Sequence, residues 1–195
     1  MVSTSAPKLD KPGAGLPFFE WAVANYILVP MRMRTTSIQQ ALDEFKDEAA
    51  QIEKMSASLS LTELTEKRLI PRLRGLEDSS RFWSVAMALE HLIIVNTRAL
   101  RLVKSLSNGI APDGKSSTAD VKPAGEINAS EIVANFHSNS TRYLTAMTDL
   151  KIEAHPSVKF SHPWFGQMNA REWVLFAAPH MRIHRNQIDE IIKRL

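Results

Sequence analysis

Two histidines near the end of the chain have a spacing that could hold a metal ion. His180 and His184 lie four residues apart in a segment with helical periodicity, so both side chains project from one face. Two imidazoles on a buried face each need a partner for their ring nitrogens, and one divalent cation suits both. The face is predicted to be apolar, because the same helical spacing places on it Trp173, Phe176, Ala177, Ile188 and Ile191.

The best candidate for a third ligand is His91, near the middle of the most apolar predicted helix. Helical bundles build metal sites from facing helices, and three histidines leave an open position of the kind that catalytic zinc sites have. The alternative is that His91 binds no metal and is a hydrogen-bonded or half-exposed histidine. We expect it to point inward, because its stripe also carries Ser84, Met87, Ala88, Val95 and Arg98.

Other polar residues are placed around this pair by their spacing. Gln187 follows His184 by three residues and is expected to hydrogen-bond a ligand or the substrate. His162 precedes a proline, which predicts an extended or turn conformation, and it can border the site because the final helix follows closely. His155 also precedes a proline and is expected in a loop, and His137 is expected to be solvated.

The sequence motifs of other types of active site are absent. A Ser-His-Asp site has no nucleophile-elbow context, and a di-iron bundle would need Glu-x-x-His on two helices. Asp189 and Glu190 follow the histidine pair but do not share its helical face. The chain has no cysteine, which excludes disulfides, thiolate ligands and a cysteine nucleophile, so that any reacting thiol must come from a substrate or cofactor.

The elements that must position these residues are helices. A chain of 195 residues, 44% of them hydrophobic, suits one domain, which we expect over 15–195 after a disordered tail at 1–14. We expect an all-α fold, a bundle of four long helices with an additional short N-terminal helix, a long surface loop at 110–126 and no strand of useful length. Capping residues, glycines and prolines place helices at about 16–29, 37–57, 60–71, 81–107, 128–151 and 169–195.

Two of these helices contain informative prolines. Pro30 is expected to end the first helix, and Pro179 to kink the last one just before His180. The first helix, 16–29, is apolar on most sides but is too short and too interrupted to span a membrane. It is predicted to be either a buried helix or a surface for self-association. A net charge of +3 without a basic block gives no argument for nucleic-acid binding.

Three segments together resemble the DinB/YfiT-like superfamily of metal-binding four-helix bundles. Residues 82–92 (FWSVAMALEHL) are similar to its W-S-x6-H-L segment, and residues 162–166 (HPWFG) to the turn before its last helix. Residues 172–188 (EWVLFAAPHMRIHRNQI) match a W-x6-H-x3-H-x2-Q-I pattern. The N-terminal helix and the segment around Pro71 have no clear counterpart in this pattern.

The resemblance implies a zinc or nickel ion held by His91, His180 and His184, commonly in a homodimer. It implies a metal-dependent transferase that joins an external low-molecular-weight thiol to a small electrophile, with a thiol at the open metal position. The alternatives are a hydrolase that uses a metal-bound water, and a stress protein that binds metal or a small molecule without catalysis. We expect a cytoplasmic protein with a small-molecule substrate, and neither a nucleic acid nor a membrane as partner.

Overall fold

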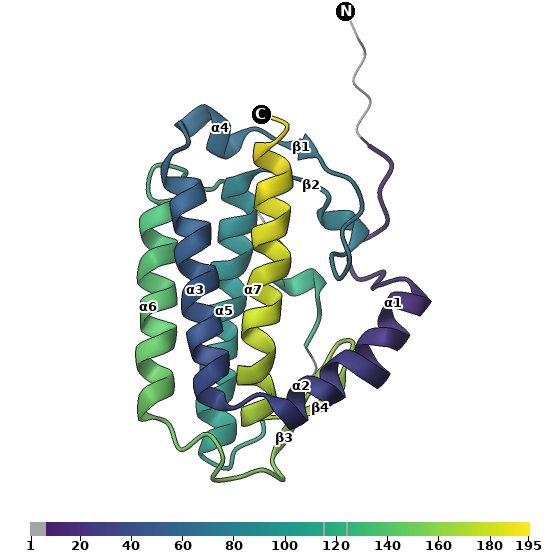
Figure 1. Ribbon diagram of the computed structural model, residues 1–195, viewed down its shortest axis with the longest axis vertical. Coiled ribbons are helices and arrows are strands. Elements are labelled where there is room, and N and C mark those ends of the chain that lie inside the picture. The colour runs from purple at the N-terminus through teal and green to yellow at the C-terminus, as the bar shows by residue number, and fades with distance from the viewer. Residues whose placement is uncertain (1–6, 115, 124) are drawn as a thin grey trace, which may run out of the picture.

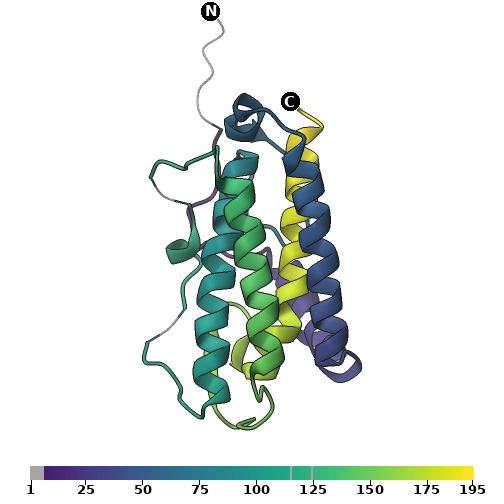
Figure 2. The same cartoon turned by 90° about the vertical axis from the view of Figure 1, so that its left-hand side faces the viewer.

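Four long helices form a bundle in the computed structural model, which describes residues 7–114, 116–123 and 125–195. α3 packs against α7 and α6, and α5 packs against the same two helices, so α3 and α5 occupy diagonal corners. Figures 1 and 2 show the four helices side by side from two directions. The predicted all-α bundle is confirmed, and its long helices are α3 (Ile38–Ala57), α5 (Val85–Ser107), α6 (Ile132–Asp149) and α7 (Ala170–Ile192).

The core lies along the axis between these helices. Apolar side chains at helical spacing point inward and lose their contact with water, which is the main stabilising term of such a bundle. Phe45 of α3 stacks on Tyr143 of α6, with ring centroids 4.6 Å apart. His91 on α5 and His184 on α7 are buried polar residues within this core.

Side-chain caps fix where the bundle helices begin. Ser37 and Asn169 both form capping boxes, at the starts predicted for α3 and α7. The long helix predicted from Arg81 begins instead at Val85, because the Ser84 hydroxyl accepts the hydrogen bond from the Met87 N–H. The residues before it form the short 3-10 helix η2 (Asp78–Ser80), and the short helix α4 (Leu61–Thr65) ends before Pro71.

The N-terminal helix continues past Pro30, so the predicted end at that residue was wrong. It consists of α1 (Phe18–Val23), the π-helical turn η1 (Ala24–Leu28) and α2 (Val29–Thr35). The wider π turn comes immediately before the proline, which then occupies a first-turn position where no N–H is needed. This helix leaves the bundle at an angle and buries none of its residues (Figure 1).

Two short strand pairs are present, although no strand of useful length was expected. β1 (Arg68–Leu69) pairs with β2 (Phe82–Trp83), and β3 (Lys159–His162) pairs with β4 (Gly166–Asn169), both antiparallel. Such short pairs cannot show the alternation by which a strand is recognised in a sequence. The second hairpin reverses direction at Gly166, whose φ of 73° is a left-handed conformation that glycine adopts without strain.

The segment predicted as a long surface loop folds back against the bundle. Its 3-10 helix η3 (Ala119–Val121) contacts α5, and Lys122 forms an ion pair with the buried carboxylate of Glu77. In the described part of the predicted tail, the N–H groups of Asp10 and Gly13 donate to Asp78 and Glu77, while residues 1–6 lie outside the described residues. None of the helices described is long and apolar enough to cross a membrane.

Candidate metal centre

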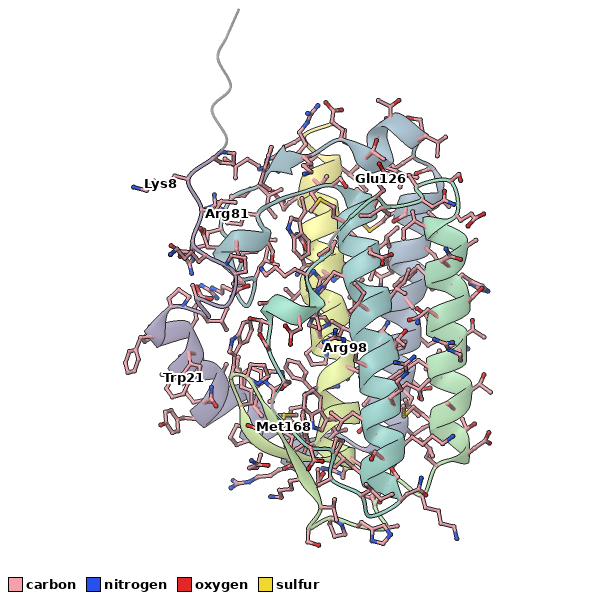
Figure 3. The ribbon with its side chains drawn as sticks, turned by 180° about the vertical axis from the view of Figure 1, so that it is seen from behind. Lys8, Trp21, Arg81, Arg98, Glu126 and Met168 are labelled. Atoms are coloured by element: carbon pink, nitrogen blue, oxygen red, sulfur yellow. The ribbon has the colours of Figure 1, made fainter. Side chains whose placement is uncertain are left out.

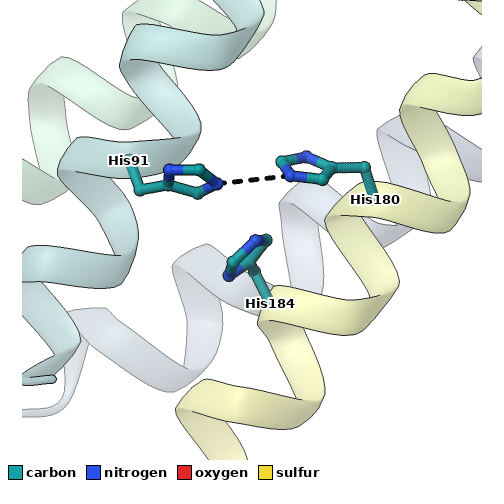
Figure 4. A group of neighbouring side chains, drawn as sticks. All are labelled: His91, His180 and His184. Carbon is teal, nitrogen blue, oxygen red and sulfur yellow. Dashed lines mark hydrogen bonds between the residues drawn. The ribbon is translucent and has the colours of Figure 1, made fainter. Parts of the chain in front are cut away.

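Three histidine rings from two helices converge beside the core. His91 on α5 faces His180 and His184 on α7, as Figure 4 shows. The ring of His91 lies 5.2 Å from that of His180 and 4.4 Å from that of His184, and the latter two are 4.6 Å apart between centroids. One ligand nitrogen from each residue lies within 4.8 Å of the other two. The predicted triad therefore meets in space.

The ring of His91 is held by a backbone carbonyl of the folded loop. Its Nδ1 lies 2.8 Å from the oxygen of Val121, and a carbonyl only accepts, so Nδ1 carries the proton. The Nε2 atom is then unprotonated, and its lone pair is directed toward His180. Trp83 packs beside the ring, with centroids 5.4 Å apart, and keeps water from that side. The segment expected to be only a surface loop thus orients one of the candidate ligands.

His184 is oriented by Gln187, as the spacing predicted. His184 Nδ1 lies 2.6 Å from Gln187 Oε1, and Gln187 Nε2 donates to the carbonyl oxygen of Ser80 at 2.7 Å. The second hydrogen bond fixes which end of the amide faces the histidine, so Nδ1 must be the donor. Gln187 is fully buried. Its amide therefore joins α7 to η2 and leaves the Nε2 lone pair of His184 free.

The helix that carries two of the histidines runs unbroken through Pro179. A proline has no N–H, so the carbonyl of Leu175, one turn earlier, loses its helical donor. Arg32 of α2 supplies one, because its Nε lies 2.6 Å from the Leu175 oxygen. Arg32 also lies 3.0 Å from the carboxylate of Glu44. The N-terminal helix thus supports α7 one turn before His180.

Burial keeps the three imidazoles neutral. The pKa of His91 is lowered to about 4, mainly by desolvation, with a contribution from the positive charge of Lys122, while the Val121 carbonyl opposes the shift. Desolvation is also the main cause that lowers the pKa of His180 and of His184 well below 6.5, with mutual repulsion between the rings adding to it. Neutral rings at pH 7 present lone pairs, which is the form that binds a metal ion.

The nitrogen spacing fits a divalent cation. Nitrogen ligands about 2.0–2.1 Å from a tetrahedral ion lie about 3.3 Å from each other. The Nε2 atoms of His91 and His180 are 3.3 Å apart, and the dashed line in Figure 4 joins them. The three residues therefore have the donor type and the protonation state of a three-histidine site, and His91 and His180 also have its nitrogen spacing.

A large cavity opens beside the triad. Its volume is about 1210 Å³, and all three histidines line it. α5 and α7 form its inner wall, while the N-terminal helix, the hairpin β3–β4 and the loop with η3 enclose the other sides. In Figure 3 the N-terminal helix, marked by Trp21, and the hairpin, marked by Met168, lie on the same side of the bundle. His180 is half-buried and faces this space.

The remaining histidines have different positions. His162 ends β3 and lines the cavity, so it borders the site as expected. His137 is exposed and pairs with Glu53, and the exposed His155 lies in the loop beside Gly109. Asp189 forms an ion pair with Lys193 on the surface, as its position off the histidine face predicted.

Comparison with protein-family models gives one match that covers most of the chain. The model of the DinB family matches residues 31–195. The chain belongs to the DinB family. The match includes the segment around Pro71, for which we found no counterpart in the sequence pattern, and starts after α1 and η1. A search of the curated proteins found no match. The N-terminal helix that covers the cavity therefore lies largely outside the matched DinB domain.

Several residues of this DinB-family site were missed in the sequence. Val121 and Ser80 act through their carbonyl oxygens, which every residue has, so their side chains give no signal. Lys122 anchors the loop by donating to Ser79 and Ser80 and by pairing with Glu77. A lysine and a glutamate far apart in the sequence look like ordinary surface charges. Nothing in a single sequence could have paired them.

Proposed function

We propose that this DinB-family protein is a metal-dependent transferase that joins an external low-molecular-weight thiol to a small apolar electrophile. The observation that carries the proposal is the triad itself, three neutral imidazoles with nitrogens within 4.8 Å of one another, opening onto a cavity. Held by His91, His180 and His184, a divalent ion such as zinc or nickel would supply a Lewis acid that keeps a bound thiol in its nucleophilic thiolate form.

The size of the cavity favours a reaction with two substrates. Pockets for a single drug-sized ligand have volumes of about 300–1,000 Å³. The cavity beside the triad has about 1210 Å³, enough for a thiol and an electrophile together. Hydrolysis would need space for only one organic substrate. The absence of cysteine supports the same choice, because no thiol of the protein competes for the metal.

The residues of the chain have distinct tasks in this proposal. His91 and His184 are fixed by Val121 and Gln187, so their Nε2 lone pairs need no rearrangement to bind the ion. His180 is more open and borders the substrate space. The largely apolar wall excludes water from the reacting thiolate, which strengthens its attraction to the cation. In the overall reaction the sulfur–carbon bond forms as the leaving group departs with the thiol proton.

The test begins with protein purified without an affinity tag that binds metal. Elemental analysis is expected to find about one zinc or nickel ion per chain in the wild type and none in His184→Ala. The metal-loaded protein is then given 1-chloro-2,4-dinitrobenzene with and without glutathione, cysteine, bacillithiol or mycothiol. Consumption that needs both the thiol and the metal supports the transferase. Bound metal with no thiol-dependent turnover against an electrophile panel would contradict it.

A parallel assay separates the other two functions. Metal-dependent cleavage of nitrophenyl esters without any thiol would identify the protein as a hydrolase. Tight metal binding with neither reaction would identify a non-catalytic binding protein. The His137→Ala variant serves as the control in each assay, because it removes an exposed histidine away from the cavity and is expected to behave as the wild type.

A further inference from the structure

His162 is a polar residue in an otherwise aromatic part of the cavity wall. Phe165 stacks on its ring with centroids 4.7 Å apart, and the rings of Phe176 and Trp173 lie at 4.9 and 5.1 Å. The imidazole comes from the end of β3, and the aromatic residues come from the hairpin turn and from α7. An imidazole among such neighbours loses much of its hydration, so its ring nitrogens gain from other hydrogen-bond partners.

Only one ring nitrogen of His162 has a partner within the chain as described. The backbone N–H of Trp164 donates to His162 Nδ1 at 3.1 Å, which closes the turn between β3 and β4. An atom that accepts from an N–H carries no proton, so in the neutral ring the proton is on Nε2. Desolvation lowers the pKa of His162 to about 3, which keeps the ring neutral at pH 7. Among residues 7–114, 116–123 and 125–195, no acceptor for this Nε2–H is found.

We propose that the Nε2–H of His162 donates a hydrogen bond to an acceptor oxygen of the apolar substrate in the cavity. His162 is then a positioning residue, separate from the triad. The proposal deepens the proposed function by naming the class of electrophile, an apolar compound that carries a carbonyl, nitro or similar oxygen. It rests on that function only in assigning the electrophile to this cavity.

The surroundings of His162 support an apolar partner with one polar atom. Phe160, Trp164 and Phe165 of the hairpin segment and Phe176 of α7 line the cavity together with His162. Aromatic walls bind flat or aliphatic groups by burying their surface. The Nε2–H of His162 among them adds orientation, since a ligand oxygen that meets no donor would lose its hydrogen bonds to water without replacement.

The test uses two naphthalenes of nearly equal shape and the full-length protein. 2-Acetylnaphthalene has a carbonyl oxygen, and 2-ethylnaphthalene has a methylene in its place. Dissociation constants are measured by quenching of tryptophan fluorescence, with and without zinc. In His162→Asn, the shorter amide can still accept from the Trp164 N–H through its oxygen but lacks the Nε2–H. In His162→Gln, the longer amide can place an N–H near the position of Nε2.

His162→Asn is expected to weaken binding of the ketone about tenfold and to leave binding of the hydrocarbon unchanged. His162→Gln is expected to bind the ketone within about threefold of the wild type. Equal weakening of both naphthalenes would show that His162 only packs, and unchanged ketone binding would show that it donates to nothing. Either outcome overturns the proposal.

A zinc titration of the same variants separates this proposal from the function of the site. His162→Asn is expected to bind zinc within about twofold of the wild type. Loss of zinc in this variant would make His162 a ligand and overturn its positioning role. If the wild type itself takes up no metal, the proposed transferase fails, while the naphthalene pair measured without zinc still decides the role of His162.

Discussion

The Nδ1 atom of His184 lies 2.6 Å from the amide oxygen of Gln187, within a single turn of α7. The same amide donates to the Ser80 carbonyl, so Gln187 is held between a candidate ligand and the segment before α5. Removing such a support typically weakens metal binding 10- to 100-fold. The orientation of His184 therefore depends on a residue that cannot itself touch the ion.

Gln187→Met keeps the length of the side chain but removes both hydrogen bonds. We expect the affinity for zinc to fall about 10- to 100-fold, because His184 loses the acceptor that fixes its ring. The measurement is a zinc titration against a competing chelator. Asn186→Ala changes the exposed neighbouring residue and is expected to keep the wild-type affinity. Equal affinities in the two variants would mean that His184 needs no support from Gln187.

Alanine in place of a triad histidine tests the ligands themselves. His180→Ala and His184→Ala are each expected to abolish stoichiometric metal binding, since each breaks the pair of ligands that α7 presents on one face. His91→Ala is expected to weaken metal binding by several kcal/mol, because it removes one of the three ligands. Calorimetry with zinc measures all three. Full occupancy in both α7 variants would refute the site. An unaltered affinity in His91→Ala would show that His91 is not the third ligand.

The triad could be predicted because its signal is local and its residue type is rare. His180 and His184 reveal their common face by their spacing alone, and six histidines in the chain leave few candidates for a third. The helices of the bundle were recognisable for a similar reason, since capping boxes such as that of Asn169 lie within four residues. The N-terminal helix was predicted, but its end was not, because the π turn before Pro30 has no recognised sequence signal.

The surroundings of the triad could not be predicted because they depend on contacts between distant segments. Val121 meets His91 across 30 residues through a backbone oxygen. Arg32 meets the Leu175 carbonyl across 143 residues, and nothing in either segment indicates the other. The cavity exists only because the N-terminal helix, the hairpin and the folded loop all lie beside α5 and α7. Its lining is a property of the tertiary fold.

The stability of the metal-free protein is expected to fall on acidification. The pKa of His91 is about 4 and that of His162 about 3 in the folded chain, both below the 6.5 of an unfolded histidine. Above pH 6.5 both states are neutral, and stability is unaffected. Below it the unfolded chain binds the proton first, so each histidine costs about 2 kcal/mol between pH 6.5 and 5.

Urea unfolding with a chelator present measures this pH dependence. His162→Phe keeps an aromatic ring but removes the group that binds the proton. The slope of unfolding free energy against pH is therefore expected to fall by about 1.2 kcal/mol per pH unit between pH 6 and 5. The slope, not the absolute stability, is the result that counts, because the variant also loses the hydrogen bond from Trp164. The same slope in both proteins would mean that His162 is protonated as readily in the folded chain as in the unfolded one.

A double-mutant cycle tests the contact between Arg32 and α7. Arg32→Ala is expected to lower the unfolding free energy by about 1–3 kcal/mol, because the Leu175 carbonyl loses the donor that Arg32 supplies. Pro179→Ala gives the helix its own N–H for that carbonyl, so the same arginine substitution should cost less in that background. Arg34→Ala, on the exposed side of α2, is the control. Additive losses would show that Arg32 does not replace the missing donor.

The exposed apolar side of the N-terminal helix is proposed to join two copies of the chain. Phe18 is 80% exposed and Tyr26 73% exposed, and Ile27, Leu28 and Met31 add further apolar surface. An apolar patch of this kind on one helix is typical of an association surface. Light scattering is expected to give twice the 21.9 kDa of one chain for the wild type, and a single chain for the double variant Phe18→Ser, Tyr26→Ser. Ile110→Ser removes another exposed apolar side chain, 60% exposed and outside the N-terminal helix, and should leave the dimer intact. If the wild type has the mass of one chain, or if the double variant remains dimeric, this surface has no role in association.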